Sequence, residues 1–288
     1  MRALFLAICI FAEIAACTRP AINVDPGVSL QLAQYRAANI SDILYELHFD
    51  IPAEIDADIQ SKVGINFTLK DDSQALQFDF REGEEKIHAV FVNGELSDYR
   101  FLNEHIVIPP EELVVGKNIV NIELAAGTTS LNRNPGYLYT LFVPDRARTA
   151  FPLFDQPDLK ATFELSLVLA SDWVAMSNAP IQEVISSENR NIYRFEKSDL
   201  ISSYLFSFIA GEFETITQEV DGRLWTMLHR ESDTNKVSRN IDEIFNLHAA
   251  ALGWLEEYTG IAYPYQKFGF VLIPSFQYGG MEHVGAIQ

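Results

Sequence analysis

The feature that most constrains the fold is a strict two-residue alternation of apolar and polar side chains near the start of the chain. The same period returns between Ile59 and Leu69. Successive side chains of a strand point to opposite faces of a sheet, so this period is typical of a strand buried on one face. The sequence predicts two antiparallel strands, over 43–51 and 59–70. The first apolar set is Ile43, Tyr45, Leu47, Phe49 and Ile51.

Short strand-like segments continue along the chain, with turn signals at Asn93-Gly94 and Val115-Gly116. Several short strands without a convincing helix between them are typical of an antiparallel sandwich or open barrel. We therefore expect an all-β domain over residues 40–214. The segments are Leu76–Phe80, Ile87–Val92, Ile106–Ile108, Ile119–Leu124 and Phe163–Leu169.

The period changes after about Asp233. Apolar residues from Ile241 to Leu255 then recur at helical spacing, and Gly260 lies where such a helix is expected to end. The segment Lys267–Pro274, KFGFVLIP, follows and is typical of a buried strand. At 288 residues the chain exceeds a typical domain of roughly 100–200 residues. We expect a second domain, of mixed α and β structure and incomplete, over 215–288.

The N-terminal segment is typical of an exported protein. Its first sixteen residues hold a single basic residue and an apolar run too short to span a bilayer, which takes about 20 residues. We expect a signal peptide over 1–16, a tether over 17–39, and a place in the bacterial cell envelope. Cys17 follows Ile14-Ala15-Ala16, as in a lipobox, and would carry the lipid that anchors the protein to the membrane. The alternative is an ordinary signal peptide followed by an incidental cysteine.

The formal net charge of -19 makes nucleic acid an unfavourable partner, because 40 acidic residues outweigh 21 basic ones. A surface of this sign repels a phosphate backbone. The charge by itself indicates no substrate.

Near its end the chain reads Gly279-Gly280-Met281-Glu282-His283. An enzyme that removes N-terminal residues must select a free α-ammonium group, and a fixed carboxylate in a closed pocket binds that cation where an internal peptide bond offers none. Glycine lets the protein backbone approach an extended substrate closely, and a strand edge can pair with it.

This segment resembles the GAMEN-type motif of the zinc aminopeptidases of the aminopeptidase N and leukotriene hydrolase type. Residues 150–163, AFPLFDQPDLKATF, resemble the family's AFPCFDEP segment with its following LKATF. Residues 204–213, YLFSFIAGEF, resemble its YLLAFIVGEF stretch, and Tyr263–Lys267 resembles its YPxxK segment. The resemblance covers the chain from about residue 140 to its end.

The resemblance implies a fold and a set of substrate-binding residues. It implies a saddle-like antiparallel β-sandwich followed by the start of a thermolysin-like α+β catalytic domain, and substrates that are peptides with a free N-terminus. Glu282 would bind the α-amine, and the backbone of Gly279, Gly280 and Met281 would line the substrate. His283 replaces the family's more usual asparagine. Thr140-Leu141-Phe142-Val143 replaces its TQxE pattern, which would make the pocket for the first side chain more apolar.

The zinc motif that the resemblance implies, HExxH with a later Glu ligand, is missing: none of the six histidines is followed by Glu. We therefore expect a chain truncated before its metal centre, without bound zinc and inactive alone, or a naturally non-catalytic remnant. Two alternatives stay open for its role. One is an exported lipoprotein whose β domain binds a peptide, a glycan or a partner protein. The other is that the complete protein hydrolyses epoxides at the same site.

Overall fold

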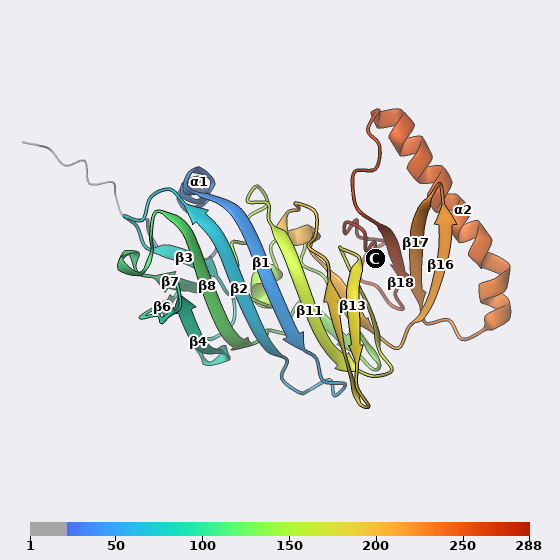
Figure 1. Cartoon of the computed structure of the whole chain (residues 1–288), viewed down its shortest axis with the longest axis horizontal. Helices are drawn as coiled ribbons and strands as arrows, with labels where there is room; N and C mark the ends of the chain where they lie inside the picture. The colour runs from blue at the N-terminus through green and yellow to red at the C-terminus, as the bar shows by residue number, and fades with distance from the viewer. Residues whose placement is uncertain (1–21) are drawn as a thin grey trace, which may run out of the picture.

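The computed structural model describes residues 22–288 (Figure 1). The predicted signal peptide and the lipidation residue Cys17 lie outside this range. Within it, each helix is too short or too polar to cross a bilayer.

An eight-stranded sheet dominates the structure, in the order β13-β14-β11-β1-β2-β8-β4-β5 (Figure 1). The strands predicted over 43–51 and 59–70 are β1 and β2, and they pair antiparallel as expected. The predicted mainly β, largely antiparallel architecture is confirmed, and β1 in addition pairs with β11 in parallel. Parallel neighbours need a long crossover connection, and here most of the β domain lies between them. The strands are β1 (Ile40–Asp50), β2 (Gln60–Leu69), β4 (Ile87–Val92), β5 (Glu95–Leu96), β8 (Gly116–Ala125), β11 (Thr162–Ala170), β13 (Ile181–Ser186) and β14 (Arg190–Phe195).

Two smaller sheets complete the β domain. One is ordered β3-β7-β6, from Leu76–Asp79, His105–Ile108 and Arg100–Leu102. The other is ordered β12-β15-β10-β9, from Val174–Ser177, Phe208–Gly211, Tyr137–Thr140 and Leu131–Asn134. Short 3₁₀ turns lie at Glu84–Lys86, Pro110–Glu112, Ala147–Thr149 and Ser203–Leu205.

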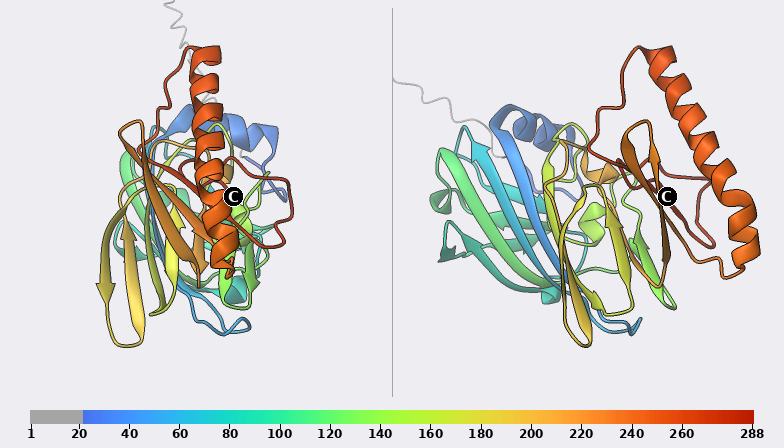
Figure 2. Two further views of the ribbon diagram at one scale, coloured as in Figure 1. Left: turned by 90° about the vertical axis from the view of Figure 1, so that its right-hand side faces the viewer. Right: turned by 45° about the vertical axis from the view of Figure 1, so that its right-hand side comes forward.

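A third small sheet and a long helix follow the β domain. Strands β16 (Glu214–Val220), β17 (Arg223–His229) and β18 (Phe268–Leu272) form the sheet, and α2 spans Thr234–Thr259. The predicted helix and its end are confirmed, because Asp233 caps its start and Gly260 ends it with a positive φ of 68°. The predicted buried strand is β18. Figures 1 and 2 place this sheet between the β domain and α2.

The main core lies on the inner face of the eight-stranded sheet, where the predicted apolar set of β1 is buried. Aromatic rings from the family-like segments fill it. Phe163 stacks on Phe206 with ring centroids 4.4 Å apart, and Phe151 packs edge-on to Phe49 at 6.1 Å. These aromatic residues are therefore structural.

The tether predicted over 17–39 is wrong for its second half. Residues Leu30–Asn39 form helix α1, which Ser29 caps by accepting a hydrogen bond from the Leu32 N–H at 3.2 Å. The segment lacks an apolar stripe, so periodicity did not reveal it. The charged side chain of Arg36, which is completely buried, holds the helix to the β domain.

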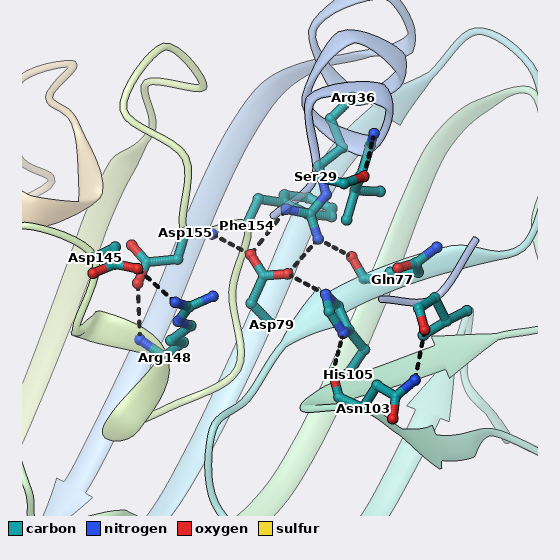
Figure 3. Close-up of polar contacts among 12 residues, drawn as sticks. Ser29, Arg36, Gln77, Asp79, Asn103, His105, Asp145, Arg148, Phe154 and Asp155 are labelled. Atoms are coloured by element: carbon teal, nitrogen blue, oxygen red, sulfur yellow. Dashed lines mark hydrogen bonds and ion pairs between the residues drawn. The ribbon is translucent and has the colours of Figure 1, made fainter. Parts of the chain in front are cut away.

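Arg36 forms a two-pronged ion pair with Asp79 of β3, with nitrogen–oxygen distances of 2.8 and 2.6 Å (Figure 3). Its guanidinium also donates to the Gln77 carbonyl at 2.7 Å. His105 Nε2 lies 3.1 Å from the same carboxylate, and the Asp155 N–H donates to it at 2.8 Å. Burial alone would raise the pKa of Asp79, but the charge of Arg36 and the hydrogen bonds from His105 and Arg36 hold it well below its usual range.

Asp155, in the family-like segment, lies beside this ion pair (Figure 3). Its carboxylate accepts hydrogen bonds from the Ser203 hydroxyl at 2.7 Å and the Arg148 N–H at 3.2 Å. Burial outweighs these bonds and raises the pKa of Asp155 to about 6. The network therefore joins α1, β3, β7, the family-like segment 150–163 and the turn at Ser203–Leu205 at one buried point.

Replacing Arg36 by Met should leave Asp79 buried without its cation and lower the free energy of unfolding by about 3–5 kcal/mol. Urea denaturation of the chain measures this loss. The matched control is Lys86→Met, because Lys86 pairs at 3.3 Å with Asp58, whose side chain is 67% exposed. That change should cost less than about 1 kcal/mol. Equal losses in the two variants would contradict the anchoring role of Arg36.

Candidate functional site

The candidate site lies in the loop that follows β18. A cleft of about 1220 Å³ runs between this loop and the N-terminal half of α2. Gly279 and Gly280 lie on its wall, together with the ends of β17 and β18. The ring of His248 on α2 stacks on Phe270 of β18, with centroids 4.2 Å apart, and fixes the helix against the strand.

The five predicted substrate-binding residues, 279–283, lie in three different environments. Gly279 and Gly280 are exposed on the cleft wall. Met281 is buried in an apolar cluster, and His283 is completely buried. Glu282 between them is exposed and makes no ion pair with another described residue. The described residues therefore do not enclose Glu282 in the closed pocket that the sequence led us to expect.

Backbone hydrogen bonds fix the direction of Glu282. The Met281 N–H donates to the Gln288 carbonyl at 2.7 Å, and the Gln288 N–H donates back at 3.1 Å. The Ala286 N–H closes the turn onto the His283 carbonyl at 3.1 Å. Because both neighbours of Glu282 are held inward, its carboxylate points outward.

The edge of β18 that an extended substrate could use is partly occupied. The Val271 N–H donates to the Ile287 carbonyl at 2.8 Å, and the Ile287 N–H donates to the Gly269 carbonyl at 2.9 Å. Ile287 thus runs parallel beside β18 as a short extra strand. This pairing ties the segment that carries Glu282 to the three-stranded sheet.

A buried asparagine of the β domain also holds this segment. The Asn178 amide donates to the Val284 carbonyl at 2.8 Å and to the Leu205 carbonyl at 2.9 Å, and its oxygen accepts from the Ser207 N–H at 2.8 Å. One side chain therefore joins the family-like segment 204–213 to the turn after Glu282. Sequence reasoning missed Asn178, since the surrounding Ser177-Asn178-Ala179-Pro180 carries no pattern that indicates such a role.

Lys267, from the YPxxK-like segment, adds a second tie to the same turn. Its Nζ donates to the Gly285 carbonyl at 2.5 Å, and no acidic side chain pairs with it among the described residues. Burial lowers the pKa of Lys267 to about 7. Gly285 needs its glycine, because its φ is 65° and a side chain would meet the Asn178 carbonyl at 2.6 Å.

His283 lies under the loop and away from the cleft. Burial lowers the pKa of its ring to about 3, so the ring is neutral near pH 7. Neither ring nitrogen has a hydrogen-bond partner among the described residues. The predicted substrate contact of His283 has no support in this geometry and stays a prediction.

The departure predicted at residues 140–143 lies next to the site. Leu141 is completely buried and shares an apolar cluster with Met281. The loop after β18 contacts the neighbouring strand β10. The rings of Tyr139 and Phe276 are 5.4 Å apart, and the Tyr137 hydroxyl donates to the Pro274 carbonyl at 3.0 Å. The stretch that replaces the polar TQxE pattern therefore provides apolar surface beside the motif.

The residues present do not fit the zinc site that the resemblance implies. Across residues 22–288 the structure contains no group of three His, Cys, Asp or Glu side chains that could hold a metal ion. Three or four such ligands are what a zinc site needs. We derive no chemical step through a metal on these residues.

Comparison with known proteins finds relatives over most of the chain. Residues 127–205 match the Peptidase M1 N-terminal domain. The chain is 29% identical over 280 residues to Aminopeptidase N of Streptomyces lividans, covering 91% of this chain and 32% of that protein. It is 32% identical over 150 residues to Aminopeptidase M1 of Arabidopsis thaliana, covering 51% and 16%. It is 32% identical over 158 residues to Tricorn protease-interacting factor F2 of Thermoplasma volcanium, covering 55% and 19%. The chain thus spans about a third or less of these relatives.

Replacing Asn178 by Ala should lower the free energy of unfolding by about 3 kcal/mol, because two buried carbonyls and one N–H lose their partner. Thermal or urea denaturation measures the loss. Asn191→Ala is the matched control, since its amide donates a single bond, to the Ser171 carbonyl at 2.9 Å near the surface. The account of Asn178 fails if its removal costs no more than that of Asn191.

Proposed function

We propose that this chain corresponds to the N-terminal portion of an M1 family aminopeptidase and that it recognises the free N-terminal amine of peptides through Glu282. The family resemblance predicted from four sequence segments is confirmed by the matches to M1 proteins. M1 family aminopeptidases are in general zinc enzymes. Recognition of the amine is the part of such an activity that the described residues can support.

The observation that carries the proposal is the exposed side chain of Glu282, which makes no ion pair with another described residue. It follows two exposed glycines on the wall of the cleft, and the paired backbone of Met281 and Gln288 holds the chain beside it in place. A carboxylate without an internal cation is free to pair with a ligand's ammonium group. Gly279 and Gly280 have no side chains to block a peptide backbone, since a Cβ would meet no atom closer than 3.5 Å at either position.

Because Glu282 is exposed, its ion pair with a ligand's ammonium group contributes little to the free energy of binding. An ion pair at the surface is worth up to about 1 kcal/mol, because water and salt screen both charges. We therefore expect weak binding of short peptides by this chain, with about fivefold preference for a free amine over an acetylated one. The proposal assigns no hydrolytic step to these 288 residues.

The test titrates the chain with trialanine and N-acetyl-trialanine and follows binding by two-dimensional NMR. The chain should prefer trialanine by about fivefold, and Glu282→Gln should remove that preference. Glu257→Gln is the matched control, because Glu257 is exposed on α2 and has no ion-pair partner among the described residues. Both peptides should remain intact.

An unchanged preference in Glu282→Gln, or its loss in Glu257→Gln, would refute the role of Glu282. Saturable, zinc-dependent release of alanine would contradict the proposal, which assigns no hydrolytic step to these 288 residues.

A further inference from the structure

A second hollow lies far from the cleft, on the outer face of the eight-stranded sheet. It has a volume of about 500 Å³ and its lining residues come mainly from the central strands β8, β2, β1 and β11. Figure 1 shows these strands side by side. The side chains of these strands alternate between the buried core and this face, so the hollow is lined by their polar set. We call it the outer groove, and its polar and aromatic lining forms two neighbouring rows.

The first row runs across five strands. Phe91 of β4 lies opposite Asn121 of β8, and Asn121 lies opposite Gly64 of β2. Gly64 lies opposite Glu46 of β1, which lies opposite Glu164 of β11. An aromatic ring thus stands at one end of the row and two carboxylates at the other.

The second row lies two residues along the same strands. It places Glu123, Lys62 and His48 opposite one another on β8, β2 and β1. His48 then lies opposite Ser166 of β11, and Ser166 opposite Arg194 of β14. Together the rows form a surface of closely spaced donors and acceptors.

Gly64 makes the floor of the groove. A Cβ at this position would lie 3.2 Å from Glu46 Oε2 and 3.4 Å from Asn121 Oδ1. The two oxygens therefore converge over the glycine from either side. Any side chain here would fill the space between them.

Both cations of the groove are paired, but Glu46 and Glu164 make no ion pair with a described residue, and Glu46 accepts only the Asn66 amide at 2.6 Å, so the groove is net negative. Lys62 pairs with Glu123 at 2.7 Å, and Arg194 pairs with Glu183 at 2.6 Å. Burial and then the charges of Lys62 and Arg194 lower the pKa of His48, against the opposing effect of Asp50, so its ring is neutral near pH 7. With both cations paired and the remaining carboxylates negative, the groove disfavours an anionic ligand.

Several uncharged groups of the groove lack partners. The side chains of Asn121, Ser166, Gln182 and His48 make no hydrogen bond with another described residue. Amides, hydroxyls and a neutral imidazole both donate and accept hydrogen bonds, which suits a ligand that also does both. Neighbouring hydroxyl groups on a ring do this, and the apolar face of such a ring can pack on Phe91.

We propose that the outer groove binds a neutral saccharide. Hydroxyls over Gly64 would donate to the Glu46 and Asn121 oxygens, and the second row would contact the next sugar unit. The volume lies within the usual range for small-molecule sites, about 300–1,000 Å³. The saccharide site is independent of the amine-binding role of Glu282, because no residue that lines the groove belongs to the segment around Glu282.

The test titrates the complete 288-residue chain with maltotriose, cellotriose and triacetylchitotriose, and with trilysine as a cationic probe. At least one trisaccharide should bind with a Kd of about 10 mM or lower and shift the NMR signals of the groove strands. Gly64→Ala and Asn121→Ala should each weaken this binding by about tenfold or more. Gln218→Ala, on exposed β16, is the matched control and should leave it unchanged.

Two outcomes would overturn the proposal. One is the absence of binding by all three trisaccharides at that concentration, including the case in which only trilysine binds and the groove acts as an acidic patch. The other is saccharide binding that both groove variants leave intact. Circular dichroism of each variant ensures that a loss of binding is not a loss of fold.

Discussion

The buried ion pair between Arg36 and Asp79 is the interaction on which the β domain depends. Two charges removed from water need close, complete pairing, and here both carboxylate oxygens of Asp79 contact the guanidinium. The same carboxylate receives the Asp155 N–H, and Asp155 receives the Ser203 hydroxyl. The family-like segment 150–163 and the turn at Ser203–Leu205 are thereby fastened to helix α1 and strand β3.

The hydrogen bonds of Asn178 connect the β domain to the candidate site. Asn178 binds two backbone groups of segment 204–213, the carbonyl of Leu205 and the N–H of Ser207. The remaining amide hydrogen of Asn178 reaches Val284, two residues after Glu282. Apolar contacts act in parallel, because Leu141 and Ile209 of the β domain share a cluster with Met281. The β domain therefore helps to hold the backbone on both sides of Glu282.

Local patterns in the sequence predicted the elements whose apolar residues recur at a regular spacing. β1 and β2 were found from apolar spacing, β18 from the segment KFGFVLIP, and α2 together with the glycine that ends it. Helix α1 was missed because a buried charge anchors it. Strand β13 has all six residues exposed, so no alternation marks it. The parallel pairing of β1 with β11 and the bonds of Asn178 join residues far apart in sequence, which no local period encodes. The motif itself was recognisable, but its division into exposed Glu282 and buried His283 required the turn that follows it.

Hydrogen exchange of the backbone amides at residues 279–288 tests the central claim, that the segment around Glu282 is locked onto the folded domains. The N–H groups of Met281, Ile287 and Gln288 donate to backbone carbonyls, whereas those of Gly279 and Gly280 donate to none among the described residues. The account predicts that the first three exchange at least about 100-fold more slowly than the two glycines, once intrinsic rates are corrected. Equal exchange at all five positions would show a mobile segment and contradict the account.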